Sequence, residues 1–148
     1  MDISRIKDCL ERNSLRFTRQ RYAVMAFLVE HNSHPTAAEI FEGVNGTNPR
    51  STSLATTYNN LHDLVNAGLI REVIVEGRAA RYDAKCTLHH HFVCDHCGGV
   101  EDVEWYALLN PEVPFLGKRE LREVELTLRG LCSDCAANVQ CGRVRDAM

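Results

Sequence analysis

Two C-x-x-C pairs constrain the fold of this chain more than any other feature. Cys94 pairs with Cys97 and Cys132 with Cys135, and 34 residues separate the two pairs. Four thiolates held about 2.3 Å from one ion form a closed tetrahedral zinc site, which leaves no position for water or substrate. A single pair can instead be a redox dithiol, but no βαβ pattern surrounds these pairs, so we favour zinc. The metal would supply much of the folding free energy of a small domain.

Cysteine and charge distribution divide the chain into two predicted domains, residues 1–84 and 85–148. Six of the seven cysteines lie in the second domain. The first domain carries 10 basic and 10 acidic residues, whereas the second carries 7 and 10, which accounts for the net charge of −3. No global basic field therefore indicates a nucleic-acid partner, and any DNA-binding surface has to be local.

Composition favours a folded, cytoplasmic protein. Of the 148 residues 45% are apolar and 25% are charged, which suffices for a buried core. The longest early run without a charge, residues 22–29, is far below the ~20 apolar residues of a membrane helix. Residues 1–12 mix charged and apolar positions, unlike a signal or transit peptide. We therefore expect no membrane partner.

Two helices are predicted before residue 30. Ile3, Ile6 and Leu10 recur at helical spacing. A second helical period covers residues 22–29 and follows Thr18, a suitable N-cap.

Two further helices are predicted before residue 70. Thr36, with a glutamate three residues later, forms a capping box, and the Asn-Gly pair at positions 45–46 is expected to stop this third helix. Ser53 can cap a fourth helix, which Gly68 would end as a left-handed residue. The predicted apolar face of the fourth helix consists of Leu54, Tyr58, Leu61, Leu64 and Val65.

The order of elements predicts an α+β fold with a winged helix-turn-helix at its N-terminus. After the helices, residues 70–76 and 79–84 have the pattern of two strands around Gly77-Arg78. Helices, a serine-capped helix and then a hairpin is the order of a winged helix, although the pattern also fits other small α+β domains.

The second domain is predicted to be small and rich in strands. Apolar and polar residues alternate over residues 89–94, 99–105 and 121–131. Pro111 and Pro114 argue against a long helix between the later strands.

Three consecutive histidines mark a second candidate metal site. In a strand His89 and His91 share a face while His90 points away, and Asp83 and Asp102 lie nearby in the sequence. Nitrogen and carboxylate ligands suit Fe(II), Mn(II), Co(II) or Zn(II). The alternative is a polar hinge with solvated histidines. His34 would ordinarily be a surface loop residue, and Cys9, Cys86 and Cys141 have no predicted role.

The fourth helix carries the candidate DNA-binding residues. Hydroxyl and amide groups of Ser53, Thr56, Tyr58 and Asn59 can contact phosphates and base edges, and asparagine can pair with adenine through two hydrogen bonds. Basic residues around Arg16 add positive charge. The alternatives to a DNA-binding role are that this helix face is simply solvated and that Tyr58 packs in the core.

Four motifs together resemble the ferric uptake regulator (Fur) family over residues 5–135. The motifs are the sequence His34-Pro35-Thr36-Ala37, the segment 53–61, the segment 89–94 and the two cysteine pairs. The resemblance implies a winged-helix DNA-binding domain joined to a small α/β dimerisation domain. It also implies a metal-dependent transcriptional repressor that binds operator DNA as a homodimer and is not an enzyme. The sequence contains neither an H-E-x-x-H motif nor a deaminase motif, which makes a zinc enzyme an unfavoured alternative.

Within the family the chain is most similar to the peroxide-sensing, PerR-like branch. Asn59 follows Tyr58 where iron-uptake regulators usually carry arginine, and Asp102 stands where they usually carry glutamate. Leu88, Leu109 and Val124 replace ligands that some relatives have at an additional metal site. Pro111, Pro114, Cys86 and Cys141 depart from the family pattern.

The resemblance also implies residue roles. Zinc would be bound by Cys94, Cys97, Cys132 and Cys135. A regulatory Fe(II) or Mn(II) would be bound by His34, Asp83, His89, His91 and Asp102. Tyr58 and Asn59 would read bases, and Arg16 would approach the minor groove. Hydrogen peroxide would oxidise His34 or His89 through bound Fe(II).

Two alternatives to this function stay open. One is an iron- or zinc-uptake regulator of the same family, and the other is a zinc-stabilised interaction module that does not bind DNA.

Overall fold

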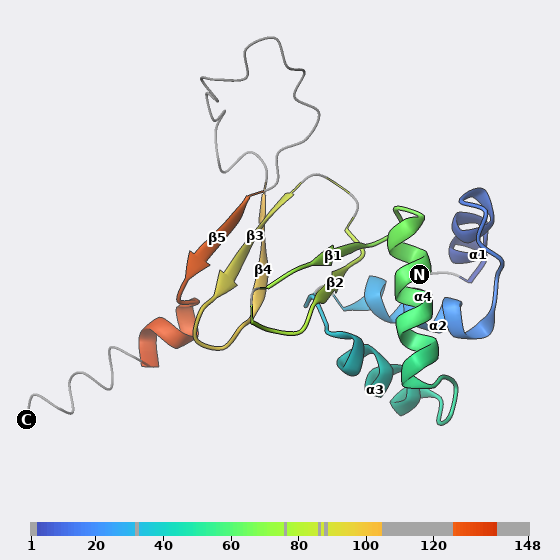
Figure 1. Cartoon of the computed structure of the whole chain (residues 1–148), viewed down its shortest axis with the longest axis horizontal. Coiled ribbons are helices and arrows are strands. Elements are labelled where there is room, and N and C mark those ends of the chain that lie inside the picture. Colours follow the sequence, from blue (N-terminus) through green and yellow to red (C-terminus); the bar gives the residue numbers. More distant parts are fainter. Residues whose placement is uncertain are drawn as a thin grey trace, which may run out of the picture. The chain divides into compact units, whose positions relative to one another are not determined.

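A computed structural model describes residues 3–31, 33–75, 77–85, 87, 89–104 and 126–138 of the chain (Figure 1). The chain divides into two compact units, Met1–Cys86 and Thr87–Met148. Both helices and small sheets are present, so the fold class is α+β as predicted. Unit 1 contains α1 (Ile3–Arg12), α2 (Arg19–Glu30), α3 (Ala37–Thr47), α4 (Leu54–Asn66), β1 (Arg71–Val73) and β2 (Arg81–Asp83). Unit 2 contains β3 (His89–Cys94), β4 (Val100–Glu104) and β5 (Thr127–Gly130).

Some predictions fall outside the described residues. These concern the proline-containing segment within residues 105–125, Cys86 and Cys141.

Side-chain caps start three of the helices where the sequence predicts them. Thr18 caps α2, and Ser53 caps α4 by accepting a hydrogen bond from the backbone three residues later. The capping box of α3 is complete, because Glu39 N–H donates to Thr36 Oγ1 at 3.3 Å and Thr36 N–H donates to Glu39 Oε2 at 2.7 Å. Each cap satisfies backbone donors that have no partner within the helix, and each is worth about 1 kcal/mol.

The predicted end of α3 was wrong by about half a turn. The helix continues through Asn45 and Gly46 to Thr47. The Asn45 amide donates to the carbonyls of Phe41 and Thr52, both at 3.1 Å, and its oxygen accepts the Thr52 N–H at 3.2 Å. Asn45 therefore stays helical and uses its side chain to hold the loop that leads to α4.

The buried face of α4 also differs from the prediction. Leu54 and Tyr58 were assigned to the core, but they are 42% and 51% exposed. The buried face instead consists of Thr57, Asn60, Leu61 and Leu64. Thr57 and Asn60 can be buried because their side chains donate to backbone carbonyls one turn earlier, at 3.1 Å and 3.0 Å.

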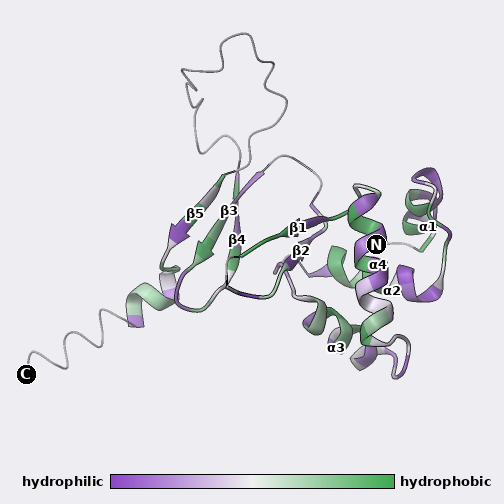
Figure 2. Ribbon diagram, viewed as in Figure 1, coloured by the Kyte–Doolittle hydropathy of each residue, from purple (hydrophilic) through white to green (hydrophobic). Residues whose placement is uncertain are grey.

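Unit 1 has its own hydrophobic core. The helices contribute apolar side chains from one face each, and α4 shows hydrophilic and hydrophobic stretches alternating along its length (Figure 2). The core residues are Ile6, Leu10, Val24, Met25, Leu28, Ala37, Ile40, Val44, Leu61, Leu64, Leu69, Ile70 and Tyr82. Gly68 ends the α4 region with a φ of 67°, the left-handed conformation predicted for it.

The hairpin of unit 1 is confirmed but shorter than predicted. β1 and β2 pair antiparallel over three residues each, with Glu72 opposite Tyr82. Tyr82 donates its hydroxyl to Glu72 Oε1 at 3.2 Å, and burial together with this carboxylate raises the pKa of Tyr82 to about 12. Thr36 forms a bridge with Arg81, which attaches the segment before α3 to the hairpin.

Unit 2 is a three-stranded sheet in the order β4-β3-β5. β3 pairs antiparallel with β4 and parallel with β5, and its bounds match the predicted strand at 89–94. The register places His91 directly opposite Asp102. A short helix over residues 133–138 follows β5.

None of the helices in the described part of the chain is long and apolar enough to cross a membrane.

Candidate metal centres

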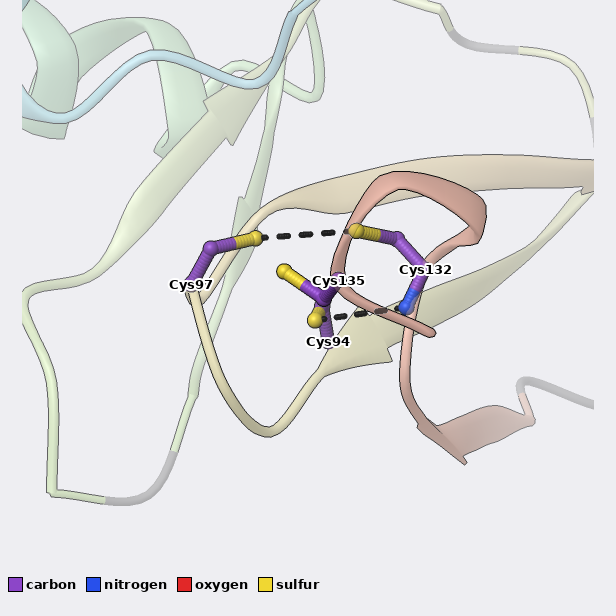
Figure 3. A group of neighbouring side chains, drawn as sticks. All are labelled: Cys94, Cys97, Cys132 and Cys135. Carbon is purple, nitrogen blue, oxygen red and sulfur yellow. Dashed lines mark hydrogen bonds between the residues drawn. The ribbon is translucent and has the colours of Figure 1, made fainter. Parts of the chain in front are cut away.

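Four cysteines gather at one end of the unit 2 sheet. Cys94 ends β3, Cys97 lies in the turn after it, and Cys132 and Cys135 follow β5. Their sulfur atoms lie within 4.8 Å of one another and point toward a common centre (Figure 3). The Sγ atoms of Cys97 and Cys132 are 3.9 Å apart. A tetrahedron with Zn–S distances of about 2.3 Å has edges of about 3.8 Å, so the cluster fits a zinc ion.

The electrostatics of the cluster favour a bound cation. Backbone N–H groups of Cys132, at 3.3 Å, and of Cys97 donate to Cys94 and lower the pKa of its thiol to about 6. A hydrogen bond with the Cys132 sulfur, with burial as a further cause, raises the pKa of Cys135 to about 12. Four adjacent thiols cannot all ionise by themselves, and a bound divalent cation would supply the missing positive charge.

The histidine strand forms a second group of ligands within unit 2. His89 and His91 lie on the same face of β3 with their Nε2 atoms 3.1 Å apart, as the strand period predicts. Asp102, opposite His91 on β4, has Oδ1 3.5 Å from His89 Nε2. His90 lies on the other face, where its Nδ1 accepts the Leu126 N–H at 3.3 Å. All three histidines are buried, which excludes the solvated hinge.

Unit 1 brings another histidine and carboxylate together. Because Thr36 pairs antiparallel with Arg81, His34 stands opposite Asp83, and the two residues offer ligand atoms within 4.8 Å of each other. Arg81 donates to the His34 carbonyl at 2.8 Å, and the Tyr82 N–H donates to the Pro35 carbonyl at 3.0 Å. Both side chains are buried, so the expectation that His34 is a surface loop residue was wrong.

Four of the five candidate DNA-binding residues lie on α4 or at its N-cap. Tyr58 and Asn59 are exposed, so Tyr58 is not a core residue. Ser53 and Thr56 sit in the first turn with their hydroxyl oxygens 2.8 Å apart. Arg16 is exposed in the loop between α1 and α2.

Three further histidines, for which the sequence reveals no partner, have one in the structure. His31 stacks on Phe27 with ring centroids 4.1 Å apart, and His62 Nε2 lies 2.9 Å from the Asn66 amide. Both partners are one helical turn away, so the i,i+4 spacing could have found them. His96 Nδ1 lies 3.5 Å from Cys135 Sγ, a contact between the cysteine pairs that no local spacing reveals.

Unit 1 has helices followed by a short hairpin, which is the architecture of a winged helix, and unit 2 is a small β unit with a four-cysteine cluster suited to zinc. The ferric uptake regulator family model matches residues 12–129. The chain belongs to the ferric uptake regulator family. Proteins of this family are transcriptional regulators and not enzymes, so the same holds for this chain.

Relatives of known function include peroxide-responsive proteins. The chain is 32% identical over 130 residues to the peroxide-responsive repressor PerR of Staphylococcus saprophyticus, covering 85% of this chain and 86% of that protein. It is 31% identical over 133 residues to the peroxide operon regulator of Bacillus subtilis, covering 87% and 90%.

Solved structures of the family share the fold. The ferric uptake regulator of Helicobacter pylori superposes with a TM-score of 0.76 at 22% identity, covering 90% of this chain and 91% of that one. The Campylobacter jejuni peroxide stress regulator superposes with a TM-score of 0.67 at 28% identity, covering 91% and 100%.

Proposed function

We propose that this protein is a metal-dependent repressor that binds operator DNA as a homodimer and senses hydrogen peroxide. The observation that carries the proposal is the group of nitrogen and carboxylate ligands in unit 2, formed by His89, His91 and Asp102. The similarity to peroxide-responsive proteins supports it. Residues 1–84 would serve as the DNA-binding domain and residues 85–148 as the dimerisation domain. Because its partner is DNA, the protein would act in the cytoplasm.

The proposed regulatory ligands come from both units. As the resemblance to the family implies, unit 1 would contribute His34 and Asp83, and unit 2 would contribute His89, His91 and Asp102. Imidazole and carboxylate ligands without thiolate suit Fe(II) or Mn(II). A divalent cation would offset the repulsion between the two carboxylates and tie the units together. Binding would then favour one arrangement of the two reading helices of a dimer.

The proposed DNA interface is the exposed face of α4. Asn59 would read a base through its amide, and Tyr58 would contact the neighbouring base or its methyl group. Ser53 and Thr56 would bind phosphate at the start of the helix, where backbone N–H groups also favour anions. Arg16 would supply positive charge in the minor groove.

The proposed signal is oxidation of a ligating imidazole. Fe(II), when bound, would activate peroxide next to the ring by one-electron chemistry, while the ring itself would supply the two electrons that reduce H2O2 overall. Overall, one H2O2 converts a ring C–H of His34 or His89 to C–OH and is itself reduced to water. The added oxygen weakens the imidazole as a ligand, so the metal and then the DNA are released. The four-thiol zinc site would keep unit 2 folded throughout.

Paired variants of the histidine strand test the proposal. We expect His91→Ala to abolish Mn(II)-dependent binding to a duplex selected from a random pool by the wild-type protein. His90→Gln, on the opposite face of the same strand, is the matched control and should bind metal normally. Fluorescence anisotropy with added Mn(II) measures both.

Two results separate this proposal from its alternatives. Binding by the Fe(II) form that survives peroxide would favour an iron- or zinc-uptake regulator of the same family. Selection that enriches no duplex, with or without Mn(II), would favour an interaction module and contradict the proposal.

A further inference from the structure

Arg21, in the first turn of α2, connects two segments of the proposed DNA interface. Its Nη1 donates to the backbone carbonyl of Arg16 at 2.6 Å. Its Nη2 donates to Asp63 Oδ2 on α4 at 2.5 Å. Its own backbone N–H binds the Thr18 cap at 3.1 Å, which fixes the start of its helix. One side chain therefore holds the loop before α2 and the last turn of α4 at the same time.

The contact differs from an ordinary surface ion pair. The Arg21 side chain is only 12% exposed, and that of Asp63 is 44% exposed. The guanidinium presents its donors in a rigid planar fork, so it can satisfy a carbonyl and a carboxylate together. A lysine ammonium has the same charge but is a single point on a flexible stem, and it cannot reproduce this geometry.

Asp63 lies one helical turn after Asn59 and therefore on the same side of α4. A free carboxylate there would repel DNA phosphates and weaken binding. Its pairing with Arg21 neutralises that charge. The Asp63 carboxylate therefore weakens DNA binding little and serves as a fixed anchor for Arg21.

We infer that Arg21 is a positioning residue, anchored by Asp63, that fixes Arg16 relative to the reading residues of α4. Arg21 itself does not read DNA in this arrangement, because its side chain is only 12% exposed and both terminal nitrogens donate within the protein. It sets the offset between the minor-groove and major-groove contacts and so contributes to sequence preference. The inference rests on the proposed DNA-binding function.

The test compares charge removal at two aspartates in the full-length, Mn(II)-loaded protein. The probes are a duplex selected from a random pool by the wild-type protein and a scrambled duplex of the same composition. Simple electrostatics predicts that Asp63→Asn tightens binding to both. The positioning role predicts that Asp63→Asn weakens binding to the selected duplex by about fivefold, a factor within the range for coupled contacts. Asp8→Asn, on the exposed face of α1, makes the same charge change as a control and should not weaken binding.

Two further variants separate positioning from a general loss of structure. Arg21→Lys keeps the charge, so binding to the scrambled duplex should be unchanged while the preference for the selected duplex falls. In the Arg16→Ala background, Asp63→Asn should no longer weaken binding, because the group being positioned is absent. A purely structural role would give the same loss in both backgrounds.

Some outcomes overturn the inference and others overturn its basis. If Asp63→Asn binds the selected duplex as tightly as the wild-type protein, or if its effect persists in the Arg16→Ala background, Arg21 has no positioning role. If instead the wild-type protein enriches no duplex at all, the proposed function fails, and the inference fails with it.

Discussion

Replacing Cys132 with serine is expected to unfold unit 2 and leave unit 1 folded. The hydroxyl is a poor zinc ligand, so the site would lose one of its four thiolates. Zinc binding by such sites contributes about 10–16 kcal/mol, or about 2.5–4 kcal/mol for each ligand if shared equally. That loss corresponds to a zinc affinity about 10² to 10³ times weaker.

The structure explains why unit 2 cannot tolerate this loss. Among its described residues, Val93 and Val100 are the buried aliphatic side chains, and together they contribute about 3–6 kcal/mol. Unit 1, in contrast, has thirteen buried residues in its own core.

Competition with a chromogenic chelator measures zinc affinity, and NMR spectra report which unit remains folded. Cys9→Ser, a thiol on α1 outside the cluster, is the matched control and should change neither property. A Cys132→Ser protein that binds zinc with unchanged affinity and keeps unit 2 folded would refute the reasoning.

Three further predictions concern unit 1. Asn59→Ala should weaken binding to the selected duplex by about 1–3 kcal/mol and relax the preference at one base pair, measured by anisotropy on single-base variants; unchanged preference would show that Asn59 does not read a base. Leu61→Ala, at a fully buried position, should lower the free energy of unfolding by about 2–5 kcal/mol in urea, and a loss well below that would misplace the core. The pKa of Tyr82 is raised from 10.0 to about 12, so its stabilising contribution is complete below pH 10 and is lost as the pH rises to about 12. Tyr82→Phe should not show this alkaline loss, and equal pH profiles in denaturant titrations would contradict the assignment.

Local sequence signals predicted the elements of the fold well. Thr18, Thr36 and Ser53 each cap the helix assigned to them, because an N-cap depends on contacts within three residues. The alternation of side chains along a strand predicted that His89 and His91 share a face, because this pattern is also local. The predicted end of α3 was wrong because the Asn45 side chain forms hydrogen bonds with Thr52 in the following loop. The predicted buried face of α4 was wrong because Thr57 and Asn60 form side-chain hydrogen bonds within the helix and can therefore be buried.

The candidate sites depended more on tertiary structure. Cysteine spacing predicted the four-thiol cluster, because two C-x-x-C pairs supply the four thiolates of a tetrahedral zinc site. Spacing could not predict the pairing of His34 with Asp83, which follows from a bridge between segments 45 residues apart. The link between Arg21 and Asp63, 42 residues apart, was missed for the same reason.

Peptide mass spectrometry after sub-stoichiometric peroxide tests the central claim most directly. The Fe(II) form should gain one oxygen atom on His34 or His89 and lose DNA binding, because the oxidant is generated beside these ligands. The Mn(II) form should bind the same duplex and remain unmodified. The contradicting result is a protein in which His34 and His89 stay unmodified while DNA binding is lost through oxidation of Cys94 or Cys97. That result would indicate a thiol switch.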